Sequence, residues 1–309
     1  MMISFVVPAR NERAYIAHTI SALREAMADE ANYEIIVVDN ASTDDTRKII
    51  ADFAITKMVP LDFQVSISKA RNIGVGCSTG AVLVFIDADI LITKVWATAL
   101  AEFLRKVAAR PLLISGYRCA LSKQPSWVEL TWFDAIKPAA NPSYINSGNL
   151  ITTRALFDAI GGFTAELTTG EDVDFCRRAV AAGATVAPDK SFFAHHEGYP
   201  RTIGAFFRRE QWHGIGDVES IGGFVTSKVA LFAYGNALLL IVSMMLLLSG
   251  SWHASAALVL CFFAANTVVL LRRFNIVSVQ SYCSIFLLHV IYLAARCTSV
   301  FVQRTTRTR

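Results

Sequence analysis

The 309-residue sequence lacks the patterns that identify several large classes of protein. It has no long run of lysine or arginine and no interleaving of basic with aromatic residues, so the net charge of +4 does not favour a nucleic-acid partner. The six cysteines lie far apart and form no C-x-x-C pair. That spacing argues against a zinc site or a disulfide framework and suits a reducing compartment.

Two signals are also missing near the N-terminus. No G-x-G-x-x-G follows the first apolar run, which disfavours a dinucleotide-binding domain with that fingerprint. The apolar stretch at residues 1–7 is too short for the core of a secretory signal and has no basic residue before it. We therefore expect the N-terminal domain to fold in the cytoplasm.

Charge is scarce in the last third of the chain, where two long apolar runs occur. Residues 229–250 and 254–271 contain no charged residue, and runs of this kind can cross a hydrocarbon core of about 30 Å. Arg272 and Arg273 follow the second run at once. This position is expected where a membrane hairpin returns to the cytoplasm.

A third apolar run, residues 283–302, is interrupted by His289 and Arg296. We interpret it as either a strained span or a re-entrant segment, because a third crossing would place the basic C-terminus outside, against the positive-inside bias. The chain is thus expected to hold one α/β domain over residues 1–215 and an α-helical membrane region over residues 216–309.

The most informative stretch of the first domain is the apolar run at residues 81–86, preceded by Gly80. It predicts a strand buried on both faces of a parallel sheet. Asp87 and Asp89 follow at a spacing that points both side chains the same way in extended chain. Ligands bind at such strand ends in open α/β sheets, and two acids there can hold a hard cation that also grips a diphosphate. The alternative is that both acids are ordinary turn residues.

Earlier parts of the chain repeat the pattern of a strand followed by polar residues. The expected elements before the central strand are strands at 3–7 and 34–38 and helices at 14–28 and 68–77. The second strand ends in Asp39, and the second helix carries Lys69 and Arg71, which either meet a phosphate at the strand ends or form a solvated basic face. Three βα units before residue 90 predict a right-handed, Rossmann-like, mostly parallel sheet.

Several motifs occur in an order and spacing that resemble a known family. They are Val-Val-Pro-Ala-Arg-Asn-Glu at 6–12, Val-Val-Asp-Asn-Ala-Ser-Thr-Asp-Asp-Thr at 37–46, Lys-Ala-Arg-Asn-Ile-Gly at 69–74, Phe-Ile-Asp-Ala-Asp at 85–89, Asn-Ser-Gly-Asn at 146–149, Gly-Gly-Phe at 161–163 and Glu-Asp-Val-Asp-Phe at 171–175. Together they resemble family 2 glycosyltransferases of the GT-A fold. The resemblance covers about residues 1–215 and implies a GT-A catalytic domain.

The resemblance implies a nucleotide-sugar site at the strand ends. Contacts to the base and ribose are then expected from Pro8, Ala9, Asn11, Glu12 and Asp39. Arg71 is expected near the base or the diphosphate, and Asp87 near the ribose or the sugar.

The resemblance also implies a divalent cation, Mg²⁺ or Mn²⁺, on Asp89. The family often places a histidine near the position of His195 and His196 as a ligand of the metal or the diphosphate. These two histidines follow a strand-like segment, and neighbours on a strand face opposite sides. At most one of them is therefore expected in the site, and the sequence does not choose between them.

Asp172 is the residue that the resemblance implies as catalytic base. It follows Glu171 in the first turn of an expected helix, where two acids are also explained by the helix dipole alone. The same dipole should keep the carboxylate of Asp172 ionised at neutral pH.

The segments between these motifs are less specific. Strands are expected at 112–121 and 145–153, a helix at 127–136, and an interfacial amphipathic segment at 200–215. Trp127, Trp132 and Phe133 at helical spacing indicate either core or a platform for an acceptor.

The sequence therefore predicts a membrane-anchored, metal-dependent, inverting glycosyltransferase of glycan or glycolipid synthesis. We expect a nucleotide-sugar donor, with a bias to uridine, and a membrane-associated or lipid-linked acceptor, with the catalytic domain on the cytoplasmic side of the inner membrane. The alternatives are a polyprenyl-phosphate sugar transferase and a non-catalytic subunit that binds nucleotide-sugars. Against the first, the Asp-Ala-Asp motif is followed by Ile90, Leu91 and Ile92, where that subfamily usually has a glutamine and then a proline. Against the second, the acids Asp87, Asp89 and Asp172 are all present.

Overall fold

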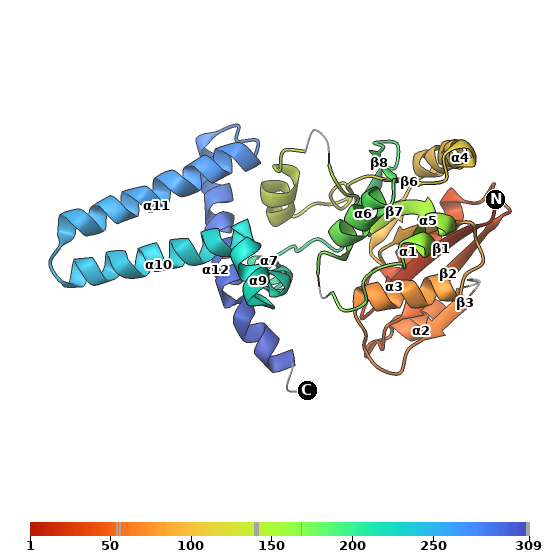
Figure 1. The fold of residues 1–309 in the computed structure, drawn as a ribbon, viewed down its shortest axis with the longest axis horizontal. Coiled ribbons are helices and arrows are strands. Elements are labelled where there is room, and N and C mark those ends of the chain that lie inside the picture. The colour runs from red at the N-terminus through yellow and green to blue at the C-terminus, as the bar shows by residue number, and fades with distance from the viewer. Residues whose placement is uncertain (54, 56, 139–141, 168, 307–309) are drawn as a thin grey trace. The chain divides into compact units, whose positions relative to one another are not determined.

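The computed structural model describes residues 1–53, 55, 57–138, 142–167 and 169–306 (Figure 1). By contacts, the chain divides into two compact units. The first unit is Met1–Lys123 with Ala140–Tyr199, and the second unit is Gln124–Ala139 with Pro200–Arg309.

The first unit is built on a seven-stranded sheet of order β3-β2-β1-β4-β7-β6-β8. Its strands are β1 (Ile3–Ala9), β2 (Tyr33–Asp39), β3 (Lys57–Pro60), β4 (Val82–Ile86), β6 (Leu113–Gly116), β7 (Asn149–Thr153) and β8 (Thr185–Pro188). The first four strands in this order are parallel, β7 is antiparallel to both neighbours, and β6 pairs parallel with β8. The mostly parallel α/β sheet expected from the sequence is confirmed.

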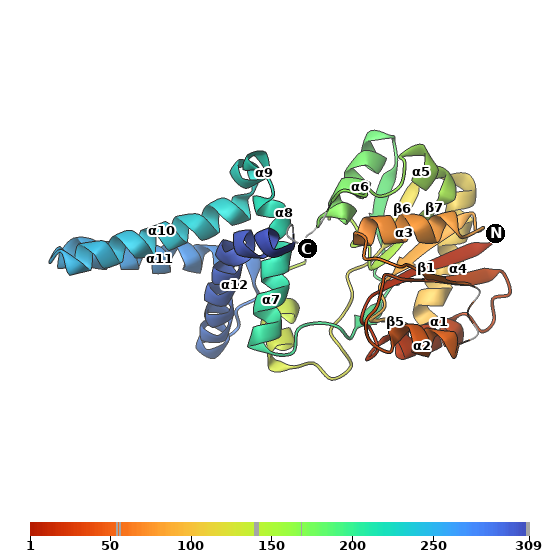
Figure 2. The ribbon, with the colours of Figure 1, turned by 90° about the horizontal axis from the view of Figure 1, so that it is seen from below.

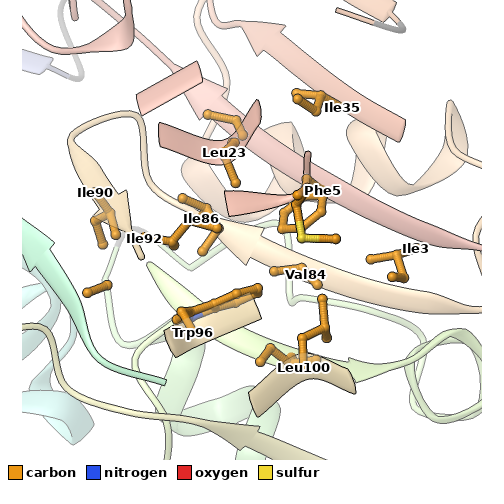
Figure 3. Close-up of a cluster of buried hydrophobic side chains, with 14 of the residues drawn as sticks. Ile3, Phe5, Leu23, Ile35, Val84, Ile86, Ile90, Ile92, Trp96 and Leu100 are labelled. Carbon is orange, nitrogen blue, oxygen red and sulfur yellow. The ribbon is translucent and has the colours of Figure 1, made fainter. Parts of the chain in front are cut away.

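Helices cover both faces of this sheet. They are α1 (Ile16–Ala26), α2 (Thr46–Ala51), α3 (Ile67–Gly76), α4 (Lys94–Ala109), α5 (Arg154–Ala159) and α6 (Glu171–Ala181). On one face, Phe5 of β1 and Ile86 of β4 share a buried cluster with Leu23 of α1 and with Trp96 and Leu100 of α4 (Figure 3). On the other face, side chains of α3, α5 and α6 pack on the alternate positions of β1 and β4.

A small antiparallel sheet joins the end of the central strand to a distant part of the chain. Its strands are β5 (Ile90–Ile92) and β9 (Ala194–His196), and Ile90 pairs with His196. The pairing brings the Asp-Ala-Asp motif beside the two histidines, which the sequence separates by about a hundred residues.

The second unit is helical. It contains the π-helix η1 (Glu129–Asp134) and the helices α7 (Ile203–His213), α8 (Ile215–Val218), α9 (Ile221–Thr226), α10 (Lys228–Leu248), α11 (Trp252–Arg273) and α12 (Val279–Thr306). Lys228–Leu248, Trp252–Arg273 and Val279–Val302 are each long and apolar enough to cross a membrane. The third apolar run is thus one continuous helix despite its polar residues.

The second unit was expected to begin after residue 215, but it also includes residues 124–139 and 200–215. Aromatic side chains of η1 and α7, which lie in these two segments, pack against the apolar helices. Trp132 of η1 packs on Phe206 of α7 and on Tyr292 of α12, with ring centroids 5.1 and 5.3 Å apart. Trp132 and Phe133 are buried core residues, whereas Trp127 is 45 % exposed. The helix expected at 127–136 is present over residues 127–134, mostly as the π-helix η1, and the strand expected at 112–121 ends at Gly116.

Candidate active site

The carboxyl ends of β1, β2 and β4 meet at one edge of the sheet. Ala9 is in register with Asp39, and Asp87 follows directly after β4, so the strand-end residues predicted from the sequence come together. The loop after β1 has Asn11 in the left-handed region at φ 56°, which asparagine tolerates better than most residues. Its Oδ1 accepts a hydrogen bond of 2.8 Å from the amide of Thr43, which links this loop to the one after β2.

Asp39 is fully buried at the end of β2. Its Oδ2 accepts a 2.6 Å bond from Nε of Arg47, and its Oδ1 accepts a 3.3 Å bond from the amide of Ser42. Arg47 also lines a pocket of about 930 Å³ between the segments 41–51 and 58–64. Asp39 is therefore fixed by two hydrogen bonds, and its partner Arg47 borders this pocket.

Arg71 is the most deeply buried cation of the site, with 2 % of its surface exposed. Nη2 lies 2.7 Å from Oδ1 of Asp87, and Nη1 lies 2.9 Å from Oε1 of Glu171. The hydroxyl of Ser147 donates to the same oxygen of Glu171 at 3.0 Å. Arg71 thereby joins the end of the central strand to the first residue of α6.

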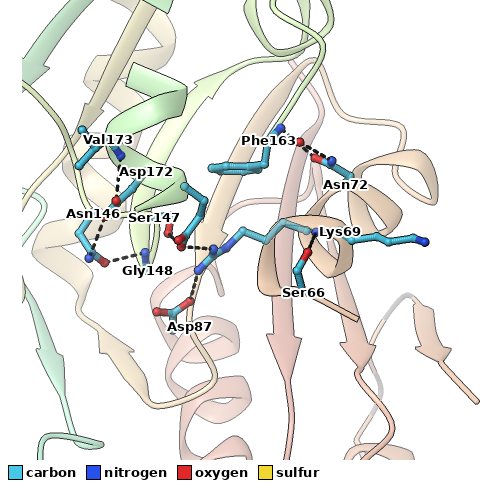
Figure 4. Close-up of polar contacts among 12 residues, drawn as sticks. Ser66, Lys69, Asn72, Asp87, Asn146, Ser147, Gly148, Phe163, Asp172 and Val173 are labelled. Atoms are coloured by element: carbon cyan, nitrogen blue, oxygen red, sulfur yellow. Dashed lines mark hydrogen bonds and ion pairs between the residues drawn. The ribbon is translucent and has the colours of Figure 1, made fainter. Parts of the chain in front are cut away.

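Asp172 is the second residue of α6 and is nearly buried. Its Oδ2 accepts a 3.2 Å bond from Nδ2 of Asn146, and its Oδ1 accepts a 2.8 Å bond from the amide of Val173 (Figure 4). Burial, with the nearby charge of Glu171, raises the pKa of Asp172 to about 6. At this pKa the carboxylate is still mostly ionised at neutral pH, as expected from the helix dipole, although loss of hydration raises the pKa above its ordinary value.

Two glycines bring backbone against the acids of the Asp-Ala-Asp motif. A Cβ atom at Gly148 would overlap the carboxylate of Asp87, and one at Gly198 would overlap that of Asp89. The backbone amide of Gly148 also donates a 2.9 Å hydrogen bond to Oδ1 of Asn146 (Figure 4). Any side chain at either position would displace an acid of the site.

The structure separates the roles of the two histidines. Nε2 of His196 lies 2.9 Å from Oδ2 of Asp89. Nδ1 of His195 lies 2.8 Å from the carbonyl oxygen of Leu121, and its ring packs against Phe193. Of the two, His196 is the residue next to the motif, as the alternation of side chains along β9 requires.

Carboxylates crowd this edge of the sheet. Burial and, after it, the charges of Asp89, Asp87 and Asp44 together raise the pKa of Glu12 to about 8. Burial also raises the pKa of Asp87, although Arg71 acts in the opposite direction. Such a cluster favours binding of a cation, which would lower these pKa values again.

The residues of this site fit a metal ion whose coordination is completed by oxygen atoms of the substrate. Over the described part of the chain, no group of three or more His, Cys, Asp or Glu side chains is arranged to hold a metal ion. Mg²⁺ is often held by one or two carboxylates together with substrate phosphates. Asp89, with His196 beside it, supplies a protein side of that kind.

Sequence reasoning missed three contributors to this site. Glu171 was treated only as a neighbour of Asp172, whereas it is the second partner of Arg71. Asn146 donates a hydrogen bond to Asp172, and Gly198 leaves room for the carboxylate of Asp89. Asn146 lies in a recognised motif, but its contact with α6 depends on the fold and gives no local signal.

Comparison with known proteins identifies similar sequences over nearly the whole chain. The family model "Glycosyl transferase family 2" matches residues 4–137, and "Glycosyl transferase family group 2" matches residues 140–297. The glycosyltransferase AglE of Haloferax volcanii is 24% identical over 227 residues, which are 70% of this chain and 73% of AglE. The pre-mycofactocin glycosyltransferase of Mycobacterium tuberculosis is 23% identical over 206 residues, 63% of this chain but only 42% of that protein.

Two solved structures share the fold. The mannosyltransferase PcManGT of Pyrobaculum calidifontis, solved with GDP-Man and Mn2+, has a TM-score of 0.60 at 18% identity and covers 96% of this chain and 86% of its own. Residues 1–349 of TarS from S. aureus give a TM-score of 0.53 at 17% identity, with 77% of this chain and 79% of that 1–349 chain covered. At these identities the likeness establishes the fold alone.

Proposed function

Because this chain belongs to glycosyltransferase family 2, we propose that it transfers a sugar from a nucleotide-sugar to an acceptor hydroxyl with inversion at the anomeric carbon. The observation that carries this proposal is the pairing of Asp172 with Asn146 beside the bridge from Arg71 to Asp87. It sets one carboxylate of raised pKa next to the acids at the strand ends.

We assign the donor to the edge formed by β1, β2 and β4. Base and ribose would lie against Pro8, Ala9, Asn11, Glu12 and Asp39. Asp87 would contact the ribose or sugar, and Arg71 would orient Asp87, because both of its terminal nitrogens already bind carboxylates. The complex of PcManGT with GDP-Man supports a nucleotide-sugar as donor, and uridine is our proposal for the base.

Asp89 and His196 would hold Mg²⁺ or Mn²⁺, in keeping with the Mn2+ of PcManGT. Such a cation, when bound, would act as a Lewis acid that neutralises the leaving diphosphate. Glu12 and Asp87 add negative charge around the same place and would strengthen its binding.

Asp172 is the proposed general base. It takes the proton of the acceptor hydroxyl while the new bond forms between that oxygen and the anomeric carbon. The bond from this carbon to the diphosphate oxygen breaks on the opposite face, and the nucleoside diphosphate leaves. A pKa near 6 lets the carboxylate be ionised at neutral pH and still accept a proton, which is what this role requires.

We propose a membrane-associated or lipid-linked acceptor, since the three apolar helices of the second unit would hold the enzyme at a membrane. Arg272 and Arg273 at the end of α11 favour an orientation in the inner membrane with the start of α10 and the catalytic unit on the cytoplasmic side.

The proposal is tested with the full chain in lipid nanodiscs and a panel of UDP- and GDP-linked sugars with Mn²⁺. We expect release of nucleoside diphosphate with one donor, stimulated by a polyprenyl-linked or glycolipid acceptor, and loss of release in Asp172→Asn. Magnetic resonance of the product should show an inverted anomeric centre. Donor binding without turnover would identify a non-catalytic subunit, and retained configuration would exclude the base mechanism.

A further inference from the structure

The helices α10 and α11 form a hairpin whose two ends differ in charge. Lys228 opens α10, and Arg272 and Arg273 close α11, so these three residues define the charged end of the hairpin. The opposite end is the turn around Gly250, which adopts φ 82°. If the hairpin inserts into a bilayer, the charged end lies at the membrane surface.

The middle of α12 contacts this charged end. The guanidinium of Arg273 lies 5.3 Å from the ring centroid of Tyr292. Nη1 of Arg296 lies 3.1 Å from Oδ2 of Asp217, whose Oδ1 accepts a 2.9 Å bond from Ser227, the N-cap of α10. Tyr292 and Arg296 are therefore at the level where the hairpin begins and ends.

This placement conflicts with a third membrane span. Residue 292 is the centre of the apolar run 283–302, so in a spanning helix it would lie at the bilayer midplane, about 15 Å below the hydrocarbon boundary. The contacts with Arg273 instead place it at the boundary. Consistent with this, α12 lies across the base of the hairpin and not alongside it in both views (Figures 1 and 2).

One face of α12 packs against α7, and the charge of Arg296 on α12 is neutralised by a carboxylate. Ser299 donates a 2.7 Å hydrogen bond to the carbonyl oxygen of Gln211, and a Cβ atom at Gly214 would overlap its side chain, so α12 and the end of α7 are in close contact. Nη2 of Arg296 lies 3.0 Å from Oε2 of the buried Glu210. The charge that interrupts the apolar run is thus paired within the unit.

His289 accounts for the other interruption. Its Nε2 lies 2.9 Å from Oδ1 of Asn266 in α11, whose Nδ2 donates to Oδ1 of Asn236 in α10 at 2.7 Å. Asn266 lies seven residues before the end of α11 and Asn236 eight residues after the start of α10, so these bonds fix the crossing about 10–12 Å from the charged end. The crossing is therefore specified by polar side chains from all three helices.

The opposite face of α12 is exposed and apolar. Its members recur at intervals of three, four or seven residues and are Cys283, Leu287, Val290, Ala294 and Phe301. We call these five residues the α12 stripe. At 3.6 residues per turn they lie opposite the buried Tyr292, Ala295 and Ser299, and so on the side of α12 away from α7. A helix with a packed polar side and an exposed apolar side is suited to a membrane surface.

We propose that α12 lies in the plane of the membrane, crossing the hairpin near its charged end, with the α12 stripe against the acyl chains. The lipid is the expected occupant because the stripe continues the apolar surface that α10 and α11 leave exposed. The chain then crosses the membrane only in the hairpin, and the C-terminus stays on the side where α10 begins. This inference rests on the proposed membrane anchoring and is independent of the transfer reaction.

The test measures the depth of each stripe position in the bilayer. A fluorophore is placed on native Cys283 or on Leu287→Cys, Val290→Cys, Ala294→Cys or Phe301→Cys, with the other exposed cysteines changed to serine. The full chain is reconstituted in vesicles whose lipids carry bromine at known depths. We expect similar depths for all positions, each shallower than that of the control, native Cys261 on α11.

Each alternative gives a different pattern. A depth that is greatest at Val290 and Ala294 and shallow at both ends would show a third span and overturn the inference. Stripe probes that no brominated lipid quenches, while Cys261 is quenched, would mean that protein covers the stripe and would overturn it as well.

Two further readouts separate this inference from the proposed function. An unquenched Cys261 would refute insertion of the hairpin, and with it this inference and the membrane anchoring, whereas nucleoside diphosphate release would still test the reaction. Protease-sensitive tags before Met1 and after Arg309 should become accessible from the same side of sealed vesicles. Tags on opposite sides would contradict the in-plane helix.

Discussion

Two arginines, one in each unit, bridge pairs of carboxylates in the same manner. Arg71 lies 2.7 and 2.9 Å from Asp87 and Glu171, and Arg296 lies 3.0 and 3.1 Å from Glu210 and Asp217. Both bridges join elements far apart in sequence, and in both the Nε atom is buried without a hydrogen-bond partner among the described residues.

The surroundings of the two bridges differ in their balance of charge. Arg209 lies 2.6 Å from Glu210, so two cations meet two carboxylates in the second unit. Around Arg71, by contrast, carboxylates outnumber cations. Burial and neighbouring acids raise the pKa of Glu12 to about 8 and that of Asp172 to about 6. A balanced cluster holds helices together, whereas an acid-rich one is prepared to bind a cation and to accept a proton.

The largest effect on turnover is expected at Asp89, because the excess of negative charge around Arg71 would serve to bind the metal there. Asp89→Asn removes the carboxylate proposed to bind the metal and should lower kcat by about 10³-fold or more, since a Lewis-acid cation supplies several kcal/mol of charge stabilisation. Turnover is measured against Mn²⁺ concentration, and a chelator should abolish wild-type activity. Asp217→Asn, which removes an acid from the balanced cluster, should leave kcat near wild type.

Wild-type turnover in the presence of a chelator, or normal turnover of Asp89→Asn at saturating donor, would exclude the metal role. The thermal midpoint of Asp89→Asn should match wild type, because an asparagine oxygen can still pair with His196, the side-chain partner of Asp89.

The next effect concerns Asp172. Asp172→Asn keeps the shape of the side chain but cannot accept a proton, so kcat should fall by about 10²–10⁴-fold. Affinity for the nucleoside diphosphate with metal, measured by calorimetry, should barely change. Glu171→Gln is the matched control at the neighbouring position, and greater damage there than at Asp172 would mean that the base is misassigned.

Much of this fold could be predicted from local sequence. The apolar runs that become β1, β2 and β4 are buried on both faces, and such strands are readable because nearly every residue is apolar. The placement of Asp39, Asp87 and Asp89 follows, since parallel strands present their carboxyl ends at one edge. The hairpin is equally readable, because its length and lack of charge suffice.

The remainder depends on contacts that leave no local pattern. The choice between His195 and His196 is set by the pairing of β5 with β9, and one residue of slippage would reverse it. Glu171 is 100 positions away from Arg71 along the chain. The orientation of α12 depends on where Asn266 and Asp217 lie, and its composition alone is that of a membrane span.

Removing each arginine compares the two bridges directly. Arg71→Met removes a nearly buried cation from Asp87, which is 34 % exposed, and from Glu171, which is 12 % exposed, and should lower the free energy of unfolding by about 3 kcal/mol. Arg296→Met should cost less, because Arg296 is more exposed and Arg209 remains to pair with Glu210. Thermal unfolding in detergent measures both, and equal losses would contradict the difference in burial.

A smaller effect is expected from pH. Because the pKa of Asp172 is raised to about 6 and the base must be ionised, kcat should be nearly constant above pH 7 and fall about tenfold per unit well below pH 6. The profile is measured at saturating donor, acceptor and metal. A rate that stays flat to pH 4.5 would show that Asp172 is not the titrating base.

The smallest effect separates Glu171 from Asp172. The charge of Glu171 contributes to the raised pKa of Asp172, after burial, because a neighbouring anion disfavours a second negative charge. Glu171→Gln removes that charge and leaves the cationic Arg71 nearby, so the pKa of Asp172 should fall and the acidic limb of the kcat profile should move to lower pH by a fraction of a unit. Asp174→Asn is the control, since Asp174 already pairs with Arg177 and Arg178 and should not move the limb. An acidic limb that moves to higher pH in Glu171→Gln would mean that Glu171 acts on Asp172 through hydrogen bonding to Arg71 and Ser147 and not through its charge.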